Sequence, residues 1–303
     1  MVQNFTREND ENGVISVRPM PSPEELEAFY AGIYFQQTPS ATFSTQYSDE
    51  ELAQRRLRAD LAMFALARID GIEDELGAFL EIGCGEGFLL HAAQERGYRV
   101  KGVDFSDVGL RNFNPQLLKR VEIGDAFGIL DRILGGEECF QVCALMNVLE
   151  HVRDAELLLR GVRKVLLPDG VAIVTVPNDY SPIQARLMEE GLIDHEFWFQ
   201  PPQHLHYFNV DSVKRFAAHC GFDVVDSFAD FPIDFFLFHP GSNYVKNSEQ
   251  GKSAHNARIM LDLLLAERGI EPYYRFCQAV SACGAGRNVT VLLRSRKKGS
   301  CKQ

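Results

Sequence analysis

The pattern of apolar and polar positions divides the chain into a helical start and a longer region in which strands and helices alternate. Residues 1–20 show no clear period, and we expect them to be irregular. Ser22 and Ser48 each stand three residues before a glutamate, which is the spacing of a capping box at a helix start. The apolar positions after Ser48 recur on one helical face as far as about residue 69. The pattern therefore predicts two helices ahead of the first strand.

From Ala78 onward, short apolar runs that are typical of buried strands alternate with helical segments. The predicted strands are 78–82, 98–104, 121–123, 140–146, 171–176, 222–228 and 288–294. The predicted helices are 87–96, 107–113, 152–167, 210–220 and, in the less regular stretch 231–287, about 254–268. Such alternation predicts an α/β fold, a doubly wound Rossmann-like sheet of seven strands that is mostly parallel.

Composition narrows the possible functions. The chain has 303 residues, with 31 basic and 42 acidic side chains and a formal charge of −11. An acidic chain repels phosphate backbones, so we expect no nucleic-acid partner. No apolar run reaches the roughly 18 residues of a membrane span, and the first residues do not resemble a signal peptide. Seven scattered cysteines without a CxxC motif favour a reduced, cytoplasmic location. The basic residues at the C-terminal end are expected to form a solvated tail.

A glycine-rich turn is the strongest local feature. Gly83, Gly85 and Gly87 come between the strand 78–82 and a helix, so a ligand can approach the backbone and meet free helix N–H groups. A dinucleotide fingerprint needs its third glycine at position 88, which is phenylalanine here. Glu81 precedes the turn, and its carboxylate suits a ligand with an ammonium and a sulfonium better than a pyrophosphate.

Asp104 closes the second strand, 21 residues after Gly83. An acid at this point can accept hydrogen bonds from the two hydroxyls of a ribose. NAD and S-adenosylmethionine both carry that ribose, so Asp104 does not separate them. The alternative is that Asp104 caps the end of the strand.

Four segments in order, FLEIGCGEGFLL (79–90), GVDFS (102–106), GDAF (124–127) and the run 144–170, resemble class I S-adenosylmethionine-dependent methyltransferases. The resemblance covers residues 77–230 and the last strand. More loosely, the chain resembles the small-molecule methyltransferases of bacterial polysaccharide and natural-product pathways. It implies an antiparallel last strand. It also implies S-adenosyl-L-methionine as cofactor and a cofactor site made of Glu81, Gly83, Cys84, Gly85, Gly87, Asp104, Phe105, Asp125, Ala126, Asn147 and Val148.

The resemblance also implies what these residues do. The three glycines border the methionine part, and Glu81 holds its amino group. Asp104 accepts from the ribose, with Phe105 beside the adenine. Asp125 and Ala126 bracket the edge of the adenine, unless Asp125 only forms a turn after Gly124. Asn147 and Val148 face the methyl-donor centre, although a plain turn at the strand end would also explain Asn147.

Three histidines are the candidates for a catalytic base, which is needed when the acceptor must lose a proton. His151 follows the fourth strand, next to Glu150, and could instead be a helix-start residue that shapes the cleft. If the segment around His204 and His206 is extended, both rings share one face and form a base with its partner or line the acceptor pocket. A metal site with His195 or Glu196 as a further ligand is a less favoured alternative, and we expect no metal.

These observations predict a methyltransferase that acts on an oxygen or nitrogen of a small molecule, such as a sugar or natural product. A quinone-biosynthesis type O-methyltransferase, an NAD(P)-dependent oxidoreductase and a non-catalytic cofactor-binding module are the alternatives. We expect a helical cap (1–76), a cofactor-binding core (77–230), a lid insertion (231–287) and a last strand with a basic tail (288–303). We expect the aromatic residues between the fifth and sixth predicted strands either to stack on the acceptor or to seal the lid.

Overall fold

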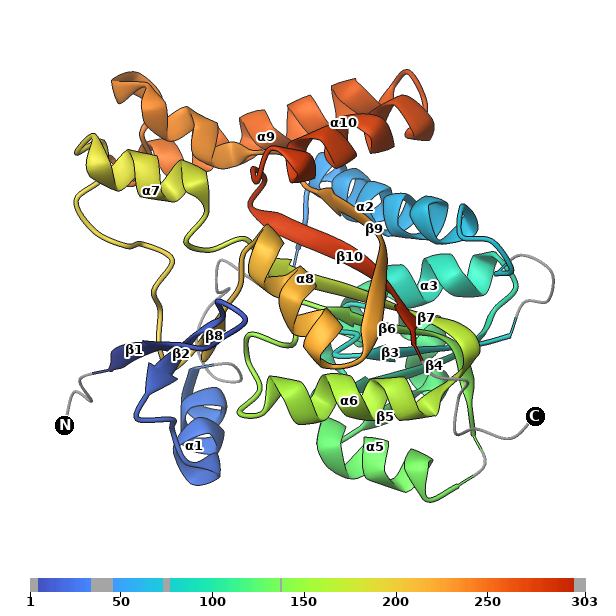
Figure 1. Cartoon of the computed structure of the whole chain (residues 1–303). Coiled ribbons are helices and arrows are strands. Elements are labelled where there is room, and N and C mark those ends of the chain that lie inside the picture. The colour runs from blue at the N-terminus through green and yellow to red at the C-terminus, as the bar shows by residue number, and fades with distance from the viewer. Residues whose placement is uncertain (1–4, 34–45, 73–76, 137, 297–303) are drawn as a thin grey trace.

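A computed structural model describes residues 5–33, 46–72, 77–136 and 138–296. Its central strands are β3 (Ala78–Ile82), β4 (Arg99–Asp104), β5 (Val121–Ile123), β6 (Phe140–Met146), β7 (Leu166–Pro177), β9 (Phe222–Ala229) and β10 (Asn288–Ser295). They form one sheet in the order β5-β4-β3-β6-β7-β10-β9 (Figure 1). Only β10 runs antiparallel to its neighbours within this sheet. The predicted α/β doubly wound sheet with an antiparallel last strand is confirmed.

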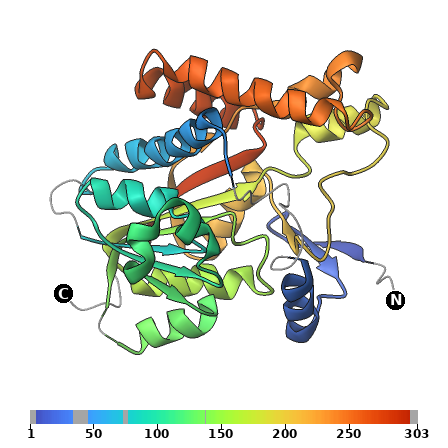
Figure 2. The same cartoon turned by 180° about the vertical axis from the view of Figure 1, so that it is seen from behind.

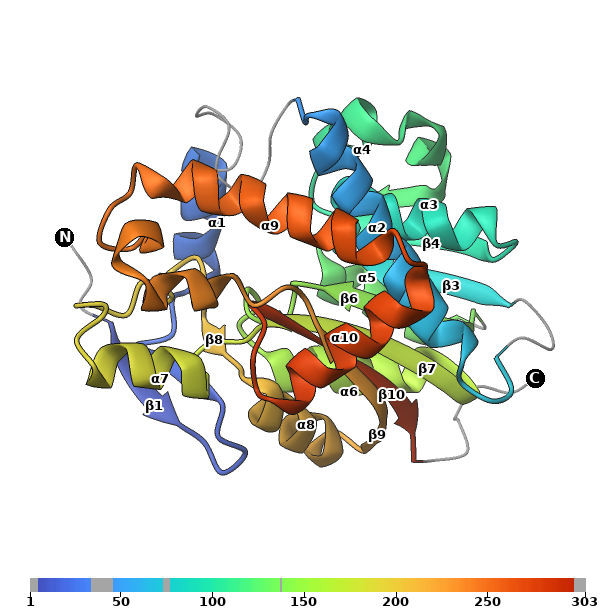
Figure 3. The same cartoon turned by 90° about the horizontal axis from the view of Figure 1, so that it is seen from above.

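Helices cover both faces of the sheet, as Figure 2 shows from behind. One face carries α5 (Ala126–Leu134), α6 (Ala155–Val165) and α8 (Val210–His219). The other carries α2 (Asp49–Ala67), α3 (Phe88–Glu95), α4 (Val108–Phe113) and α10 (Ile270–Ala282), and α9 (Gln250–Ala266) packs against α2 (Figure 3). Both faces of the sheet are therefore buried, which explains the nearly continuous apolar sequence of β6.

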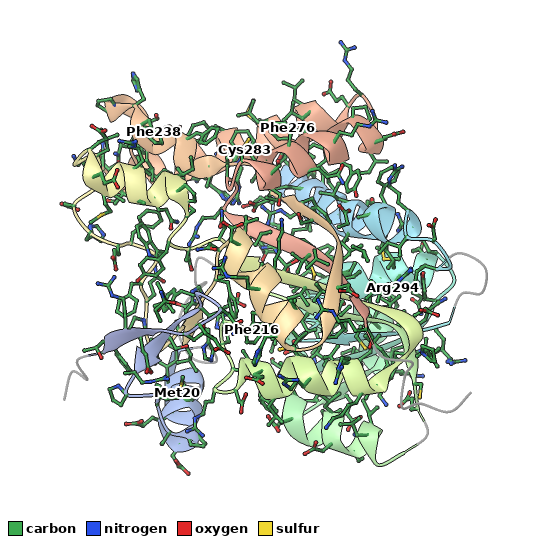
Figure 4. All side chains as sticks on the ribbon, viewed as in Figure 1. Met20, Phe216, Phe238, Phe276, Cys283 and Arg294 are labelled. Carbon is green, nitrogen blue, oxygen red and sulfur yellow. The ribbon has the colours of Figure 1, made fainter. Side chains whose placement is uncertain are left out.

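Two hydrophobic clusters fill the space between the sheet and the helices. Phe216 of α8 belongs to the first cluster and stacks edge-on against Phe208. Phe276 of α10 packs against the second, on the opposite face (Figure 4). The core thus supports the sheet from both faces, up to the strand ends that carry the candidate site residues.

A third cluster lies beside the sheet and joins distant parts of the sequence. It contains α1 (Pro23–Ile33), α7 (Pro182–Glu189) and a small sheet of β1 (Thr6–Asn9), β2 (Ile15–Arg18) and β8 (His206–Tyr207). The expectation of an irregular 1–20 is therefore wrong. The strand β1 is polar and exposed on both faces, so it shows no hydrophobic alternation. Val17 and Trp198 are buried together in this cluster.

Several elements were not predicted. Helices α5, α7 and α10 are absent from the sequence-based assignment, as are the 3₁₀ segments at Pro115–Arg120, Ile233–Phe238 and Pro240–Ser242. The helix expected near 254–268 runs from Gln250 to Ala266. The expected domain boundaries at 76, 230 and 287 stay predictions, although the third cluster draws side chains from the first three of the expected parts.

Two further expectations concern the environment of the chain. Within the described residues, no helix is long and apolar enough to cross a membrane. Cys84, Cys143, Cys220, Cys277 and Cys283 are free thiols. Cys139 is disulfide-bonded, and the expected reduced, cytoplasmic location stays a prediction. The end of the basic tail lies outside the described residues.

Candidate functional site

The glycine turn after β3 is held in place by the next strand. The backbone N–H groups of Gly83 and Cys84 donate to the carbonyl of Val103 at 2.7 and 3.2 Å. Gly83, Gly85 and Gly87 all have positive φ, at 71°, 52° and 76°. A Cβ atom at Gly83 would lie 2.6 Å from Cγ2 of Val148. The sequence therefore needs glycine here because the backbone is left-handed and a side chain would fill the turn.

Asp104 ends β4 and faces this turn. Its Oδ2 accepts from the N–H of Gly85 at 2.7 Å, and its Oδ1 accepts from the N–H of Ser106 at 3.0 Å. Burial raises the pKa of Asp104, although these backbone donors oppose the rise. Both roles considered for Asp104, the cap of the strand end and the acceptor for a ribose, therefore have a structural basis. The carboxylate shapes the turn, and it keeps further lone pairs for a ligand.

Glu81 is a buried carboxylate on β3. Its Oε2 has no hydrogen-bond partner among the described residues. Burial raises its pKa well above the usual range, and the nearby Asp104 raises it further. Burial and these same two acids also raise the pKa of the Cys84 thiol. The buried carboxyl of Glu81, with an oxygen that lacks a partner and with Asp104 nearby, forms an environment that stabilises a cation.

The adenine-side candidates lie at the adjoining strand ends. Phe105 follows Asp104 and is 65% exposed, so its ring is accessible to a planar ligand. Asp125 is the N-cap of α5 and accepts from the N–H of Gly128 at 2.7 Å. Ala126 is buried in the first turn of the same helix. The structure gives Asp125 a turn-forming role, and its exposed carboxylate remains accessible.

Asn147 and Val148 follow β6 at the same edge of the sheet. Asn147 has a φ of 56°, and its N–H donates to the carbonyl of Thr175 at 2.9 Å. Its side chain donates from Nδ2 to Oδ1 of Asn288 at 3.2 Å. The residue therefore has the strand-end turn conformation, and it also links β6 to the start of β10.

His151 and His204 are brought together, with Glu150 beside them. The two rings meet edge to face with centroids 4.9 Å apart. Nε2 of His151 lies 3.8 Å from Oε1 of Glu150, and Nδ1 contacts the carbonyl of Gln203 at 2.7 Å. Ligand atoms of Glu150, His151 and His204 all lie within 4.8 Å of one another, so the group could also hold a metal ion.

Burial dominates the electrostatics of this group. It lowers the pKa of His151 and lowers that of His204 to about 3. It raises the pKa of Glu150 to about 8, and neither Glu150 oxygen has a hydrogen-bond partner among the described residues. Burial therefore favours the neutral form of all three side chains.

His206 is separated from this pair. The segment is extended only at His206 and Tyr207, so the two histidines do not share a face. Nδ1 of His206 contacts Oγ of Ser16 at 2.8 Å, and Nε2 contacts the carbonyl of Arg153 at 3.4 Å. These contacts assign His206 to the junction between β2, β8 and the loop before α6.

The alternative metal ligands also lie apart from the histidine pair. His195 pairs with the exposed Asp194 at 2.6 Å, while Glu196 forms an ion pair with Arg7 and accepts from Tyr180. The three-residue group of potential ligands found among the described residues includes neither of them.

Sequence reasoning missed a buried ion pair near the same edge. Nη1 of Arg287 donates to Oδ1 of Asp179 at 2.5 Å, and Asp179 is only 1% exposed. Burial raises the pKa of Asp179, while Arg287 opposes that rise. The available signals were an acid two residues after β7 and a basic residue directly before β10.

Comparisons with known proteins identify the family. A family model described as a methyltransferase domain matches residues 50–227, more than half of the chain. The ubiquinone biosynthesis O-methyltransferase of Cupriavidus pinatubonensis is 27% identical over 219 residues, covering 69% of this chain and 80% of that protein. Its counterpart in Caulobacter sp. is 34% identical over 101 residues, covering 33% of this chain and 40% of that protein.

A solved structure shows the same fold over most of the chain. Coclaurine N-methyltransferase bound to N-methylheliamine and S-adenosylhomocysteine has a TM-score of 0.52 and 17% identity. The match covers 92% of this chain and 84% of that one.

The site described above fits the cofactor that this family uses. The unpartnered Oε2 of Glu81 can accept from an ammonium. The carboxylate of Asp104 has lone pairs for a diol. The family match, the fold and this fit lead to one conclusion: the chain belongs to the methyltransferase domain family and is a class I S-adenosylmethionine-dependent methyltransferase.

Proposed function

We propose that this enzyme methylates a hydroxyl oxygen of a small molecule and that His151 removes the proton from that hydroxyl. The observation that carries the proposal is the contact between Nδ1 of His151 and the carbonyl of Gln203 at 2.7 Å. A carbonyl oxygen can only accept, so Nδ1 must carry the hydrogen. Nε2 of the neutral ring is then the basic nitrogen.

S-adenosylmethionine supplies a methyl group that is already activated on a sulfonium. The task of the chain is to align that group with the acceptor and to exclude water. Glu81 and Asp104 hold the cationic, ribose-bearing ligand, with the glycine turn against its methionine part. Asn147 and Val148 lie at the next strand end, and we assign them to the methyl-donor centre.

Glu150 supports the base. It is buried, burial favours its neutral form, and its Oε1 lies 3.8 Å from Nε2 of His151. When His151 gains a proton, the positive charge favours ionisation of Glu150. The resulting imidazolium and carboxylate stabilise each other in a buried setting. His204 packs edge-on against His151 and restricts the orientation of its ring.

The relatives support an oxygen acceptor. The curated proteins from Cupriavidus pinatubonensis and Caulobacter sp. are named as O-methyltransferases of ubiquinone biosynthesis. We therefore place an O-methyltransferase of the quinone-biosynthesis type ahead of an N-methyltransferase or a sugar methyltransferase. We also propose that the expected helical cap (1–76) and lid insertion (231–287) select the acceptor.

A labelled-methyl transfer assay against phenols, sugars and amines tests the proposal. We expect transfer to at least one hydroxyl compound, and we expect His151→Ala to lower kcat by about 100-fold or more. The affinity for S-adenosylhomocysteine should stay within about threefold. Methylation confined to amines, or an unchanged kcat in a folded His151→Ala variant, would overturn it. Loss of activity on adding a chelator would instead favour a metal at Glu150, His151 and His204.

A further inference from the structure

Two arginines stand on helices outside the sheet. Arg58 lies on α2 and Arg258 on α9, and these helices pack against each other (Figure 3). Nε of each arginine is buried, and neither has a hydrogen-bond partner among the described residues. A buried guanidinium N–H without an acceptor is costly, so each arginine has unmet donor capacity.

Arg258 has no carboxylate partner within 4.0 Å in the part of the chain that the structure describes. The hydrogen bond recorded for its Nη2 goes to Nδ1 of His255 at 3.0 Å. Burial, and after it the charge of Arg58, lowers the pKa of Arg258 to about 10, although Asp230 and Asp262 oppose the fall. The guanidinium of Arg258 therefore remains charged at pH 7, and it lies close enough to Arg58 to be repelled by that side chain.

The nearest acids already serve other donors. Oδ1 of Asp230 accepts from the N–H groups of Arg287 and Asn288, and Oδ2 accepts from Nδ2 of Asn288 at 2.8 Å. Arg58 reaches Oδ2 at only 3.4 Å. Asp262 accepts from Gln54 at 2.5 Å and from Tyr273 at 2.8 Å. These carboxylates leave the two Nε groups without acceptors.

A short series of contacts connects the arginines to the methyl-donor edge. Arg58 contacts Asp230, which accepts from Asn288, and Oδ1 of Asn288 accepts from Asn147. Asn147 follows β6 and stands four residues before His151. The side chain of Arg58 is still 37% exposed, so a ligand can reach it. This series links Arg58 to the strand end that we assign to the methyl-donor centre.

We propose that Arg58 and Arg258 bind an anionic group of the methyl acceptor, either a carboxylate or a phosphate. Arginine presents N–H groups in a planar fork that matches both anions. An anion here would supply acceptors for both buried Nε groups and reduce the repulsion between the two charges. This inference rests on the proposed methylation of a small molecule and specifies its chemical class.

Calorimetric titration of the full chain, saturated with S-adenosylhomocysteine, tests the proposal without turnover. The probes are benzoate, phenyl phosphate and the neutral benzamide. We expect at least one of the two anions to bind ten times more tightly than benzamide, and the better anion distinguishes a carboxylate from a phosphate. Arg258→Gln should remove that preference and leave the affinity for S-adenosylhomocysteine unchanged. Arg56→Gln, an exposed change on the same helix as Arg58, should keep it.

Equal binding of anions and benzamide would overturn the inference, as would an unchanged anion preference in Arg258→Gln. If that variant does not fold, Arg258→Lys keeps the charge without the fork, and it should weaken anion binding at least threefold. The proposed base is judged separately. Methylation of phenols that carry a carboxylate or phosphate, if it depends on His151 but not on Arg258, would support the base and contradict the anion site.

Discussion

Asp104 and Gly85 are joined by a hydrogen bond of 2.7 Å from the backbone N–H to Oδ2. The acid that ends β4 therefore fixes the glycine turn that follows β3, in addition to the ribose role that we assign to it. Ligand binding and turn geometry are coupled through one carboxylate. Substitutions at this edge of the sheet consequently need readouts for both folding and affinity.

Gly83→Ala should damage the cofactor site. The new Cβ would meet Cγ2 of Val148 at 2.6 Å in a backbone with a φ of 71°. We expect at least a tenfold loss of affinity for S-adenosylhomocysteine and a loss of about 2 kcal/mol in the free energy of unfolding. Gly71→Ala is the matched control, since its φ is 82° and nothing lies within 4 Å of the new Cβ. It should cost about 1 kcal/mol through backbone strain alone and keep its affinity.

Alanine at each of the three candidate histidines should separate their roles. His151→Ala and His204→Ala should lower kcat, because these rings lie together beside Glu150. His206→Ala should mainly reduce thermal stability, because both of its ring nitrogens are engaged by Ser16 and Arg153. Steady-state kinetics with melting curves provide the comparison. Mild effects on kcat at all three positions would indicate catalysis by positioning alone.

The pH dependence of stability should reveal Glu150. Its pKa is about 8 in the folded chain and about 4.3 when unfolded. The folded state therefore holds a proton that the unfolded state has lost, so this group destabilises the fold increasingly as pH rises from about 5 to 8. Glu150→Gln should gain stability relative to the parent over that range and reach a plateau above it.

Glu156→Gln gives the opposite case for comparison. Hydrogen bonding to Arg160 lowers the pKa of Glu156, so its ionised form favours folding. This contribution is present above the unfolded pKa and is lost as pH falls through the folded pKa. Urea denaturation between pH 4 and pH 9 measures both variants. A difference in the free energy of unfolding between the parent and Glu150→Gln that does not change with pH would contradict the raised pKa of Glu150.

The buried ion pair between Arg287 and Asp179 should be important for stability. Arg287→Met would leave Asp179 as an uncompensated buried carboxylate, and we expect a loss of about 3 kcal/mol in the free energy of unfolding. Arg186→Met removes an exposed arginine that pairs with Glu190, and it should change stability by less than about 1 kcal/mol. Equal losses in the two variants would show that the ion pair has no special role.

Much of the fold could be predicted because its strands are short apolar runs and its turns contain glycine. The ends of β3 and β6 match the sequence pattern for this reason. Helix α7 was missed although Ser181 and Gln184 form a capping box around Pro182. Helix α5 was missed because its N-cap, Asp125, was considered only as a ligand or a turn residue.

The rest of the site depends on tertiary contacts that no local pattern records. His151 and His204 are 53 positions apart in the sequence, yet their rings touch. Arg58 and Arg258 come from opposite ends of the chain and lie together only because α2 packs against α9. The polar strand β1 pairs with β2 through backbone hydrogen bonds, so its side chains carry little signal.

The most direct test of the cofactor site is a calorimetric titration of S-adenosylhomocysteine into the parent chain and into Asp104→Ala. We predict at least a tenfold loss of affinity, which corresponds to about 1.4 kcal/mol or more. Asp131→Ala, an exposed change on α5, should leave the affinity unchanged. Unchanged affinity in a folded Asp104→Ala variant would contradict the account, because the ligand would then bind without the carboxylate on which the site depends.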